Sequence, residues 1–361
     1  MSKVFFADMR CPVGTSLLHK LEKLLDKAGF AQLPFTKRYA AIKIHFGEPG
    51  NLSALRPHYA KVVADKITAL GGRPFLTDCS TLYVGRRSNA LDHLESAWEN
   101  GYSFLSCGCP ILMGDGLKGT DDVEVPVPGG KLLKTALIGR TVMDADIVVS
   151  LNHFKGHECT GFGGALKNLG MGCGSRAGKM AMHSDGKPQV NPRLCTGCRF
   201  CAKHCAHCAI SFGTDGKARI DHTKCVGCGR CIGVCSFHAI DSGSFNANDA
   251  LNQKIAEYTA AVLAGKPHFH ISVAAQISPY CDCHGDNDAA VVPDIGIFAS
   301  SDPVALDHAC IDAVNAAPAL YSDGQSGDHF GNIHPGTNWR TQLEHAEAIG
   351  LGEQKYEIVR V

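Results

Sequence analysis

Eight cysteines in the second half of this 361-residue chain follow one spacing pattern twice, and this repeat constrains the fold more than any other feature. The first run is Cys195-x2-Cys198-x2-Cys201-x3-Cys205, and the second is Cys225-x2-Cys228-x2-Cys231-x3-Cys235. Two residues between thiolates let a short loop bring three sulfurs to three corners of one centre, while the fourth cysteine, beyond a turn, reaches another centre. Each run is therefore expected to fold around an inorganic centre.

This spacing is typical of bacterial ferredoxins with two 4Fe-4S clusters. We predict one cluster on Cys195, Cys198, Cys201 and Cys235, and the other on Cys225, Cys228, Cys231 and Cys205. Two zinc sites are the alternative, because tetrahedral zinc also uses paired C-x2-C. Zinc ribbons do not need a third cysteine and a fourth in each run, which favours the clusters. Ala206 and Ser236 replace the usual proline after each run, and the additional Cys208 is interpreted as a buried bystander.

The 18 cysteines make the redox compartment important. Residues 1–14 include Asp8 and Arg10 and lack the apolar core of a signal peptide. We therefore expect a cytoplasmic protein whose thiols are reduced ligands or buried groups. Lys plus Arg and Asp plus Glu both number 35, so no field of one sign favours nucleic acid or an anionic membrane as a partner. No apolar run approaches the roughly 18 residues needed to span a bilayer.

Outside the cysteine repeat, short apolar runs alternate with helical stripes, which is typical of an α/β fold. Strands are expected near residues 4–7, 39–46, 75–78, 111–113, 147–151, 269–273, 291–297 and 356–359. Helices are expected near residues 17–28, 55–70, 88–100, 132–143, 251–262, 303–314 and 339–346. The continuous hydrophobicity of residues 147–151 predicts a central strand that is buried on both faces.

The same alternation precedes and follows the cysteine repeat. We therefore predict one α/β domain with a doubly wound, mostly parallel sheet, formed by residues 1–186 and 244–361. Residues 187–243 are predicted to form a small α+β ferredoxin-like insert within it.

A glycine-rich segment, residues 152–174, directly follows the predicted central strand. Ligands of doubly wound sheets bind beyond the carboxyl ends of such strands, and glycines let backbone N–H groups approach an anion or cofactor. The predicted cofactor-binding residues are His153, Lys155, Gly161, Gly163, Gly164, Lys167 and Asn168. Candidates for a catalytic role are Lys155, His157 and Lys167. A structural crossover is the alternative, and the segment matches neither nucleotide-binding glycine motif.

A third motif, Cys281-Asp282-Cys283-His284, follows another predicted strand. Cys281 and Cys283 would close an additional metal site together with His153, His157 or Cys159, and His157 is the preferred further ligand. Scattered reduced thiols explain these cysteines equally well. His45, Asp78, Cys79 and Asp294 also fall near predicted strand ends and are weaker candidates. No Ser-His-Asp order or isolated carboxylate pair stands out, so a hydrolase is not supported.

Long segments resemble the family of iron-sulfur-centre proteins called domain of unknown function 362, in the branch that carries an inserted ferredoxin module. These segments are residues 43–51, 74–79, 82–83, 153–173, 279–283 and 292–309, together with the eight repeat cysteines. The resemblance covers essentially the whole chain and implies a fold and two 4Fe-4S clusters, but no settled reaction. Residues 161–172 are also faintly similar to the Gly-Gly-x-Lys segment of nickel-pincer lactate racemases, which implies a cofactor cradle.

Three functions follow as expectations. In the first, the two clusters pass single electrons between a redox partner protein and a small-molecule ligand or cofactor at residues 152–174. Only twenty-one residues separate Cys173 from Cys195, which would place the clusters beside this ligand. In the second, the protein is a non-catalytic electron carrier. In the third, it is an accessory protein that binds or delivers a metal or cofactor, as Cys281 and Cys283 suggest.

Overall fold

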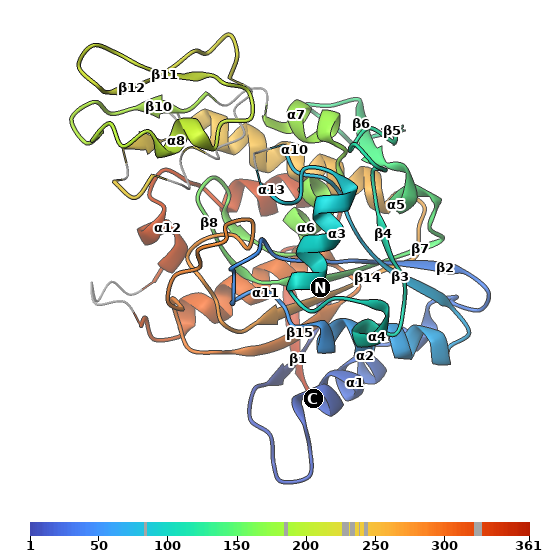
Figure 1. The fold of residues 1–361 in the computed structure, drawn as a ribbon. Coiled ribbons are helices and arrows are strands. Elements are labelled where there is room, and N and C mark those ends of the chain that lie inside the picture. The colour runs from blue at the N-terminus through green and yellow to red at the C-terminus, as the bar shows by residue number, and fades with distance from the viewer. Residues whose placement is uncertain are drawn as a thin grey trace.

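The computed structural model describes residues 1–82, 85–183, 187–225, 231, 235–237, 239–241, 245–320 and 327–361. Its main strands are β1 (Ser2–Asp8), β2 (Tyr39–Lys43), β3 (Arg73–Asp78), β4 (Ile111–Met113), β7 (Ile147–His153), β14 (His268–Ala274), β15 (Gly296–Ser300) and β16 (Tyr356–Arg360). They form one sheet in the order β16-β1-β15-β14-β7-β2-β3-β4 (Figure 1). Strand β15 is antiparallel to both of its neighbours, and every other pair is parallel. The predicted mostly parallel sheet is confirmed.

Helices cover both faces of this sheet. They are α1 (Leu17–Lys27), α2 (Pro57–Ala69), α3 (Ala90–Glu99), α4 (Phe104–Cys107), α5 (Arg140–Asp144), α6 (Ala165–Cys173), α7 (Arg176–His183), α10 (Phe245–Leu263), α11 (Pro303–Ala316), α12 (His329–Ile333) and α13 (Arg340–Ala348), with a 3-10 turn at Phe30–Gln32. Figure 1 shows α1 and α2 on the opposite side of the sheet from α10 and α13.

Side-chain alternation along β7 explains this two-sided packing. Ile147, Val149 and Leu151 pack in the apolar cluster of α1 and α2. Val148 points the other way, into the cluster that α6 and α10 contribute. All seven residues of β7 are buried, as expected for a central strand with helices on both faces.

Local sequence signals fix several helix starts. The side chain of Asp302 accepts hydrogen bonds from the backbone N–H groups of Val304 and Ala305, at 2.8 and 3.1 Å, and Pro303 occupies the first helical position. Helix α11 therefore begins where the sequence predicts. Ser16 caps α1 in the same way, by accepting from the His19 N–H.

Two expected elements are wrong. Residues 132–143 form no single helix, because β6 (Thr135–Gly139) pairs with β5 (Asp122–Pro126) in a hairpin before the short α5 begins. Ala136 and Ile138 of this hairpin pack against the α10 side of the core, so the apolar pattern reflects burial on a strand. The strand expected at 291–297 lies later, at β15, because Val291 and Val292 are buried in a core cluster without joining the sheet.

The glycine-rich segment, residues 152–174, forms regular secondary structure. Strand β8 (Lys155–His157) pairs antiparallel with β9 (Gly161–Gly163), and α6 follows directly. Gly156 lies at this hairpin because a Cβ atom there would meet the carbonyl oxygen of Pro279 at 2.1 Å. The segment thus forms a hairpin and a helix that pack tightly against the loop after β14.

The described part of the cysteine repeat forms its own small unit, seen at the upper left of Figure 1. Its elements are β10 (Gln189–Val190), α8 (Phe200–Lys203), β11 (Ile210–Phe212), β12 (Ala218–Ile220) and β13 (Ile240–Asp241). Strand β10 pairs with β13, so the two ends of the segment meet next to α7 and α10. Cys228 lies outside the described residues, and the limits 187 and 243 stay a prediction.

Among the helices that the structure describes, none combines the length and the hydrophobicity that crossing a bilayer requires.

Candidate functional site

A cavity lies beyond the carboxyl ends of β2, β3 and β7, and it encloses about 890 Å³ of empty space, part of it open to solvent. From β2 the strand order runs to β3 and β4 in one direction, and to β7 and β14 in the other. The order of the strands therefore reverses between β2 and β7, and the cavity lies at this switch point. This is the position at which doubly wound sheets bind ligands. Residues from α6, α7, α10, hairpin β8–β9 and the loop after β14 complete its wall.

A buried ion pair forms one side of the cavity. Lys43 Nζ, at the end of β2, lies 2.9 Å from Asp78 Oδ1 at the end of β3 and 3.0 Å from Asn168 Oδ1 on α6. Burial alone would raise the pKa of Asp78, but the Lys43 ammonium and the nearby His93 ring, whose Nε2 lies 3.5 Å from Asp78 Oδ2, outweigh it and hold this pKa well below its usual value. Asp78 is therefore ionised and fixes the Lys43 ammonium at the cavity wall.

His153 anchors the loop that follows β14. Its Nδ1 lies 2.8 Å from Asp282 Oδ1, and its Nε2 lies 2.9 Å from the carbonyl oxygen of Ala275. Both partners are acceptors, so both ring nitrogens donate. Lys155 Nζ lies 3.3 Å from the other carboxylate oxygen of Asp282. His153 is absent from the cavity wall, whereas Lys155 belongs to it; together they fix the backbone between Cys281 and Cys283.

The predicted glycines serve close packing in this structure. A Cβ atom on Gly164 would lie 2.2 Å from Asp307 Oδ1, and one on Gly161 would lie 2.8 Å from Trp339. Asp307 accepts hydrogen bonds from the N–H groups of Ala165 and Leu166, so a protein carboxylate already caps the N-terminus of α6. Gly161, Gly163 and Gly164 are not part of the cavity wall.

Asp307 gives a pH prediction. Burial raises its pKa from 3.8 to about 7, against the opposing effect of the Leu166 and Ala165 N–H groups. A group with a raised pKa in the folded state stabilises the fold fully below its unfolded pKa and loses this contribution as the pH rises through its folded pKa. Asp307→Asn does not titrate. The free energy of unfolding of the wild type relative to this variant should therefore fall between about pH 4 and pH 7, measured by urea denaturation. A difference that stays constant over this range would contradict the assignment.

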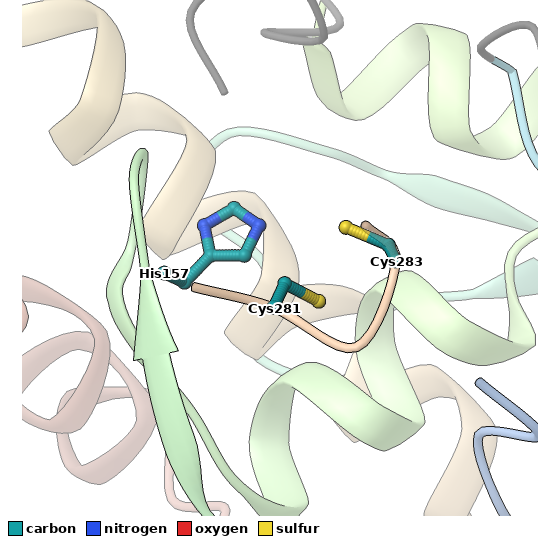
Figure 2. A group of neighbouring side chains, drawn as sticks. All are labelled: His157, Cys281 and Cys283. Carbon is teal, nitrogen blue, oxygen red and sulfur yellow. The ribbon is translucent and has the colours of Figure 1, made fainter. Parts of the chain in front are cut away.

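A cluster of polar side chains lies at another wall of the cavity. A ring nitrogen of His157 and the sulfurs of Cys281 and Cys283 lie within 4.8 Å of one another, and the same holds for donor atoms of Glu158, Cys283 and His284. Figure 2 shows the two sulfurs pointing toward one another beside the imidazole of His157. The expected group of His157, Cys281 and Cys283 is thus brought together as a possible metal-binding group.

Hydrogen bonds define the roles within this cluster. His157 Nδ1 accepts from the backbone N–H groups of Cys159 and Thr160, at 3.1 and 3.2 Å. Burial lowers the pKa of His157 well below its usual value, so the ring is neutral and its Nε2 carries the proton. His284 Nε2 lies 2.9 Å from Glu158 Oε1. Burial opposes ionisation of Glu158, but the nearby histidines His157 and His284 outweigh it and hold its pKa well below its usual value.

Among the repeat cysteines that the structure describes, the surroundings of Cys201 bear on how the two runs are arranged. Burial raises the pKa of Cys201, and the nearby thiols of Cys198, Cys235 and Cys195 add to this rise. Cys235 and Cys231, from the second run, pack against the small buried cluster that contains Cys195 and Cys201 of the first run. The expectation that Cys208 is buried is wrong, because the turn after Cys205 leaves its side chain exposed.

Residues 40–312 match the family model described as Domain of unknown function (DUF362). The chain belongs to this family. No curated protein matches the sequence. One similar solved structure is the lactate racemase apoprotein from Thermoanaerobacterium thermosaccharolyticum, with 10% identity and a TM-score of 0.36 over 76% of this chain and 50% of that chain. Another is a protein from Thermotoga maritima, with 12% identity and a TM-score of 0.35 over 82% of this chain and 56% of that chain. The chain thus spans about half the length of these two proteins.

Within this member of the DUF362 family, the sequence identified part of the cavity wall. Lys155, His157, Lys167, Asn168 and Cys283 line it, as do the weaker candidates His45, Asp78 and Cys79. Asp294 instead caps a turn by accepting from the Gln276 N–H.

Four charged wall residues were not identified from the sequence: Lys43, Arg87, Glu158 and Lys179. Lys43 lies inside the strand expected at residues 39–46, whereas β2 ends at this residue and thereby places it at the cavity. Arg87, Glu158 and Lys179 reach the wall through tertiary packing.

Proposed function

We propose that this protein is an iron-sulfur redox protein that passes single electrons through two 4Fe-4S clusters to an organic anion bound in the cavity. The observation that carries the proposal is the neighbourhood of Cys201. Cys235 follows Cys201 by 34 positions in the chain, yet it packs, together with Cys231, against the small buried cluster that contains Cys195 and Cys201. A fourth ligand that crosses from the other run is the arrangement of two-cluster ferredoxins.

Sulfur spacing supports clusters over zinc. Four thiolates around one zinc ion, at about 2.3 Å each, lie about 3.8 Å from one another. Within the described part of the chain, groups of three or more ligand atoms that lie within 4.8 Å of one another occur only around Cys283. Among the described cysteines of the repeat, no three sulfurs are therefore as close together as a single zinc ion requires.

Backbone donors near the sulfurs also fit a cluster. The N–H groups of Ala218, Ala209 and Ala239 lie 3.4, 3.3 and 3.3 Å from the sulfurs of Cys195, Cys205 and Cys235. Such N–H groups stabilise the negative charge of cluster thiolates and help to set the reduction potential. When bound, the clusters supply one-electron transfer, and the eight repeat cysteines would hold them.

The charge of the cavity wall favours an anionic ligand. Lys43 pairs with Asp78, and Lys155 pairs with Asp282. In the described structure, neither Lys167 nor Lys179 lies within 4.0 Å of a carboxylate oxygen; Lys167 Nζ instead lies 3.3 Å from Cys281 Sγ. Burial lowers the pKa of Lys167, but Cys281, Cys283 and Glu158 outweigh it, so the pKa is raised and the ammonium is kept. Two cations without carboxylate partners would accommodate an anion.

Apolar side chains form the rest of the wall and favour a ligand with an organic body. Leu82, Met171, Leu251 and Ile255 line the cavity between its charged groups. Leu251 and Ile255 lie on α10, which follows the cysteine segment, and Lys179 lies on α7, which precedes it. Both helices thus connect the cavity wall to the segment that would hold the clusters.

The electron-transfer part is tested by reducing protein purified without air with titanium(III) citrate, while visible absorption and EPR are recorded. We expect bleaching and an EPR signal that together account for about two electrons per chain, one for each cluster. Clusters that keep their oxidation state within the potential range of cellular donors would contradict the proposal.

The ligand part is tested separately, with inorganic phosphate and oxalate as probes in calorimetric titrations of the same protein. Binding of at least one anion should weaken by about tenfold or more in Lys167→Met, because a charge-assisted hydrogen bond contributes about 1.5–3 kcal/mol. The exposed Lys61→Met is the control and should bind as the wild type does. Equal binding by Lys167→Met and the wild type, or no binding of either anion, would contradict an anion site.

A further inference from the structure

Cys283 belongs to both groups of possible metal ligands at the cavity wall, and neither group takes part in the proposed electron transfer. Its sulfur lies within 4.8 Å of the Cys281 sulfur and, in a second group, of a Glu158 carboxylate oxygen. Two thiolates and one carboxylate are ligands that zinc accepts, at about 2.3 Å for sulfur and about 2.0–2.2 Å for oxygen. Cys283 Sγ belongs to both groups, so it links the Cys281 sulfur to the Glu158 carboxylate.

One carboxylate oxygen of Glu158 lacks a hydrogen-bond partner. The Glu158 side chain is 8% exposed, and its Oε2 is buried without a donor, whereas its Oε1 is bound by His284 at 2.9 Å. Burying an ionised oxygen without a partner is costly. His157 Nε2 lies 4.0 Å from this oxygen, which is too far for a hydrogen bond. A cation at Oε2 would satisfy this oxygen.

The backbone that carries the two cysteines is held in place. Asp282, between them, is buried and bound by His153 at 2.8 Å and by Lys155 at 3.3 Å. The spacing of the two sulfurs therefore does not depend on a mobile loop. Such preorganisation lowers the entropic cost of binding an ion.

Lys167 lies beside one of the two sulfurs. Its Nζ is 3.3 Å from Cys281 Sγ and would donate a hydrogen bond to this sulfur when it binds an ion as a thiolate.

We infer that Cys281, Cys283 and Glu158 bind a divalent thiophilic cation such as Zn²⁺ at the wall of the cavity. His157 was the expected third ligand, but its Nδ1 accepts two backbone N–H bonds, so Nε2 keeps its proton and acts as a donor. Cys283 and Glu158 both line the cavity, so an ion held by them would be accessible from the cavity. Three protein ligands and one open position are typical of zinc sites that act on a substrate. This site is independent of the clusters.

The test uses Zn²⁺ as the probe on full-length protein purified without air with its clusters in place. We expect about one zinc per chain after desalting, and a zinc-edge X-ray absorption spectrum with two sulfur neighbours and lighter atoms in the remaining positions. Competition with a chromophoric chelator gives the affinity. Cys281→Ser and Cys283→Ser should each weaken binding by about 100-fold or more, and Glu158→Gln by about tenfold.

Cys11→Ser, at an exposed thiol, is the control and should bind zinc as the wild type does. Because the spectrum is recorded on the wild type, the inference stays testable even if a variant folds poorly. Zinc content that is equal in the wild type and in the Cys281→Ser/Cys283→Ser double variant would overturn the site. A spectrum with four sulfur neighbours, or a protein mass two hydrogens lower that reveals a Cys281–Cys283 disulfide, would overturn it as well.

Discussion

Replacing Cys235 with alanine is expected to remove the cluster that the first cysteine run holds, although Cys235 belongs to the second run. The reason is its position: Cys235 packs against the buried cluster that contains Cys195 and Cys201 of the first run. Cys198→Ala should remove the same cluster. Iron content should fall by about half, to about four atoms per chain, in either variant.

The double variant Cys198→Ala/Cys235→Ala separates crossed from uncrossed ligation. If both cysteines serve one cluster, their effects are not additive, and the double variant should also retain about four iron atoms. Cys205→Ala combined with Cys235→Ala should instead lose both clusters. Cys208→Ala, at the exposed additional thiol, is the control and should keep both. Loss of all iron from the Cys198→Ala/Cys235→Ala variant would rule out crossed ligation.

Asp78→Asn is expected to destabilise the α/β domain by about 3–5 kcal/mol, because removing one partner of a buried ion pair leaves an uncompensated charge. The Lys43 and Asp78 side chains are 1% and 3% exposed, and their atoms lie 2.9 Å apart. The free energy of unfolding, measured by urea denaturation, gives the effect. The position of Asn168 in the cavity wall should change as well, because Lys43 Nζ donates a hydrogen bond to Asn168 Oδ1.

A matched control is available at the surface. Lys61 and Asp65 form an ion pair at 2.8 Å on α2, with side chains 47% and 57% exposed. Asp65→Asn should cost less than about 1 kcal/mol, because solvent screens this pair. Similar costs for Asp78→Asn and Asp65→Asn would mean that Lys43 finds another partner in the variant, against the geometry described above.

The sequence was sufficient for the α/β fold where the signals were local. Asp302 and Pro303 define the start of α11 by capping and by fixed backbone geometry, and the all-apolar run 147–151 identifies the central strand. The helix expected at 132–143 failed because burial against α10 produces apolar residues on a strand as well as on a helix. Apolar residues indicate that a segment is buried, but whether it forms a helix or a strand depends on the segments that it packs against.

The candidate site was only partly predictable, because its chemistry depends on contacts between distant segments. Lys167 and His157 stand out in the sequence because they lie in a glycine-rich segment that follows the central strand. The ion pair of Lys43 requires β2 and β3 to be parallel neighbours. The role of His157 depends on two backbone N–H groups that only the turn after β8 brings to its Nδ1. Glu158 emerges as a candidate ligand because burial leaves one of its oxygens without a donor.

The central claim is that the cysteine repeat holds two 4Fe-4S clusters, and iron and acid-labile sulfide determined together on protein purified without air test it most directly. The account predicts about eight iron atoms and eight sulfides per chain, with Mössbauer parameters of 4Fe-4S clusters. Zinc in place of iron at the repeat cysteines, or a colourless protein without sulfide, would contradict it.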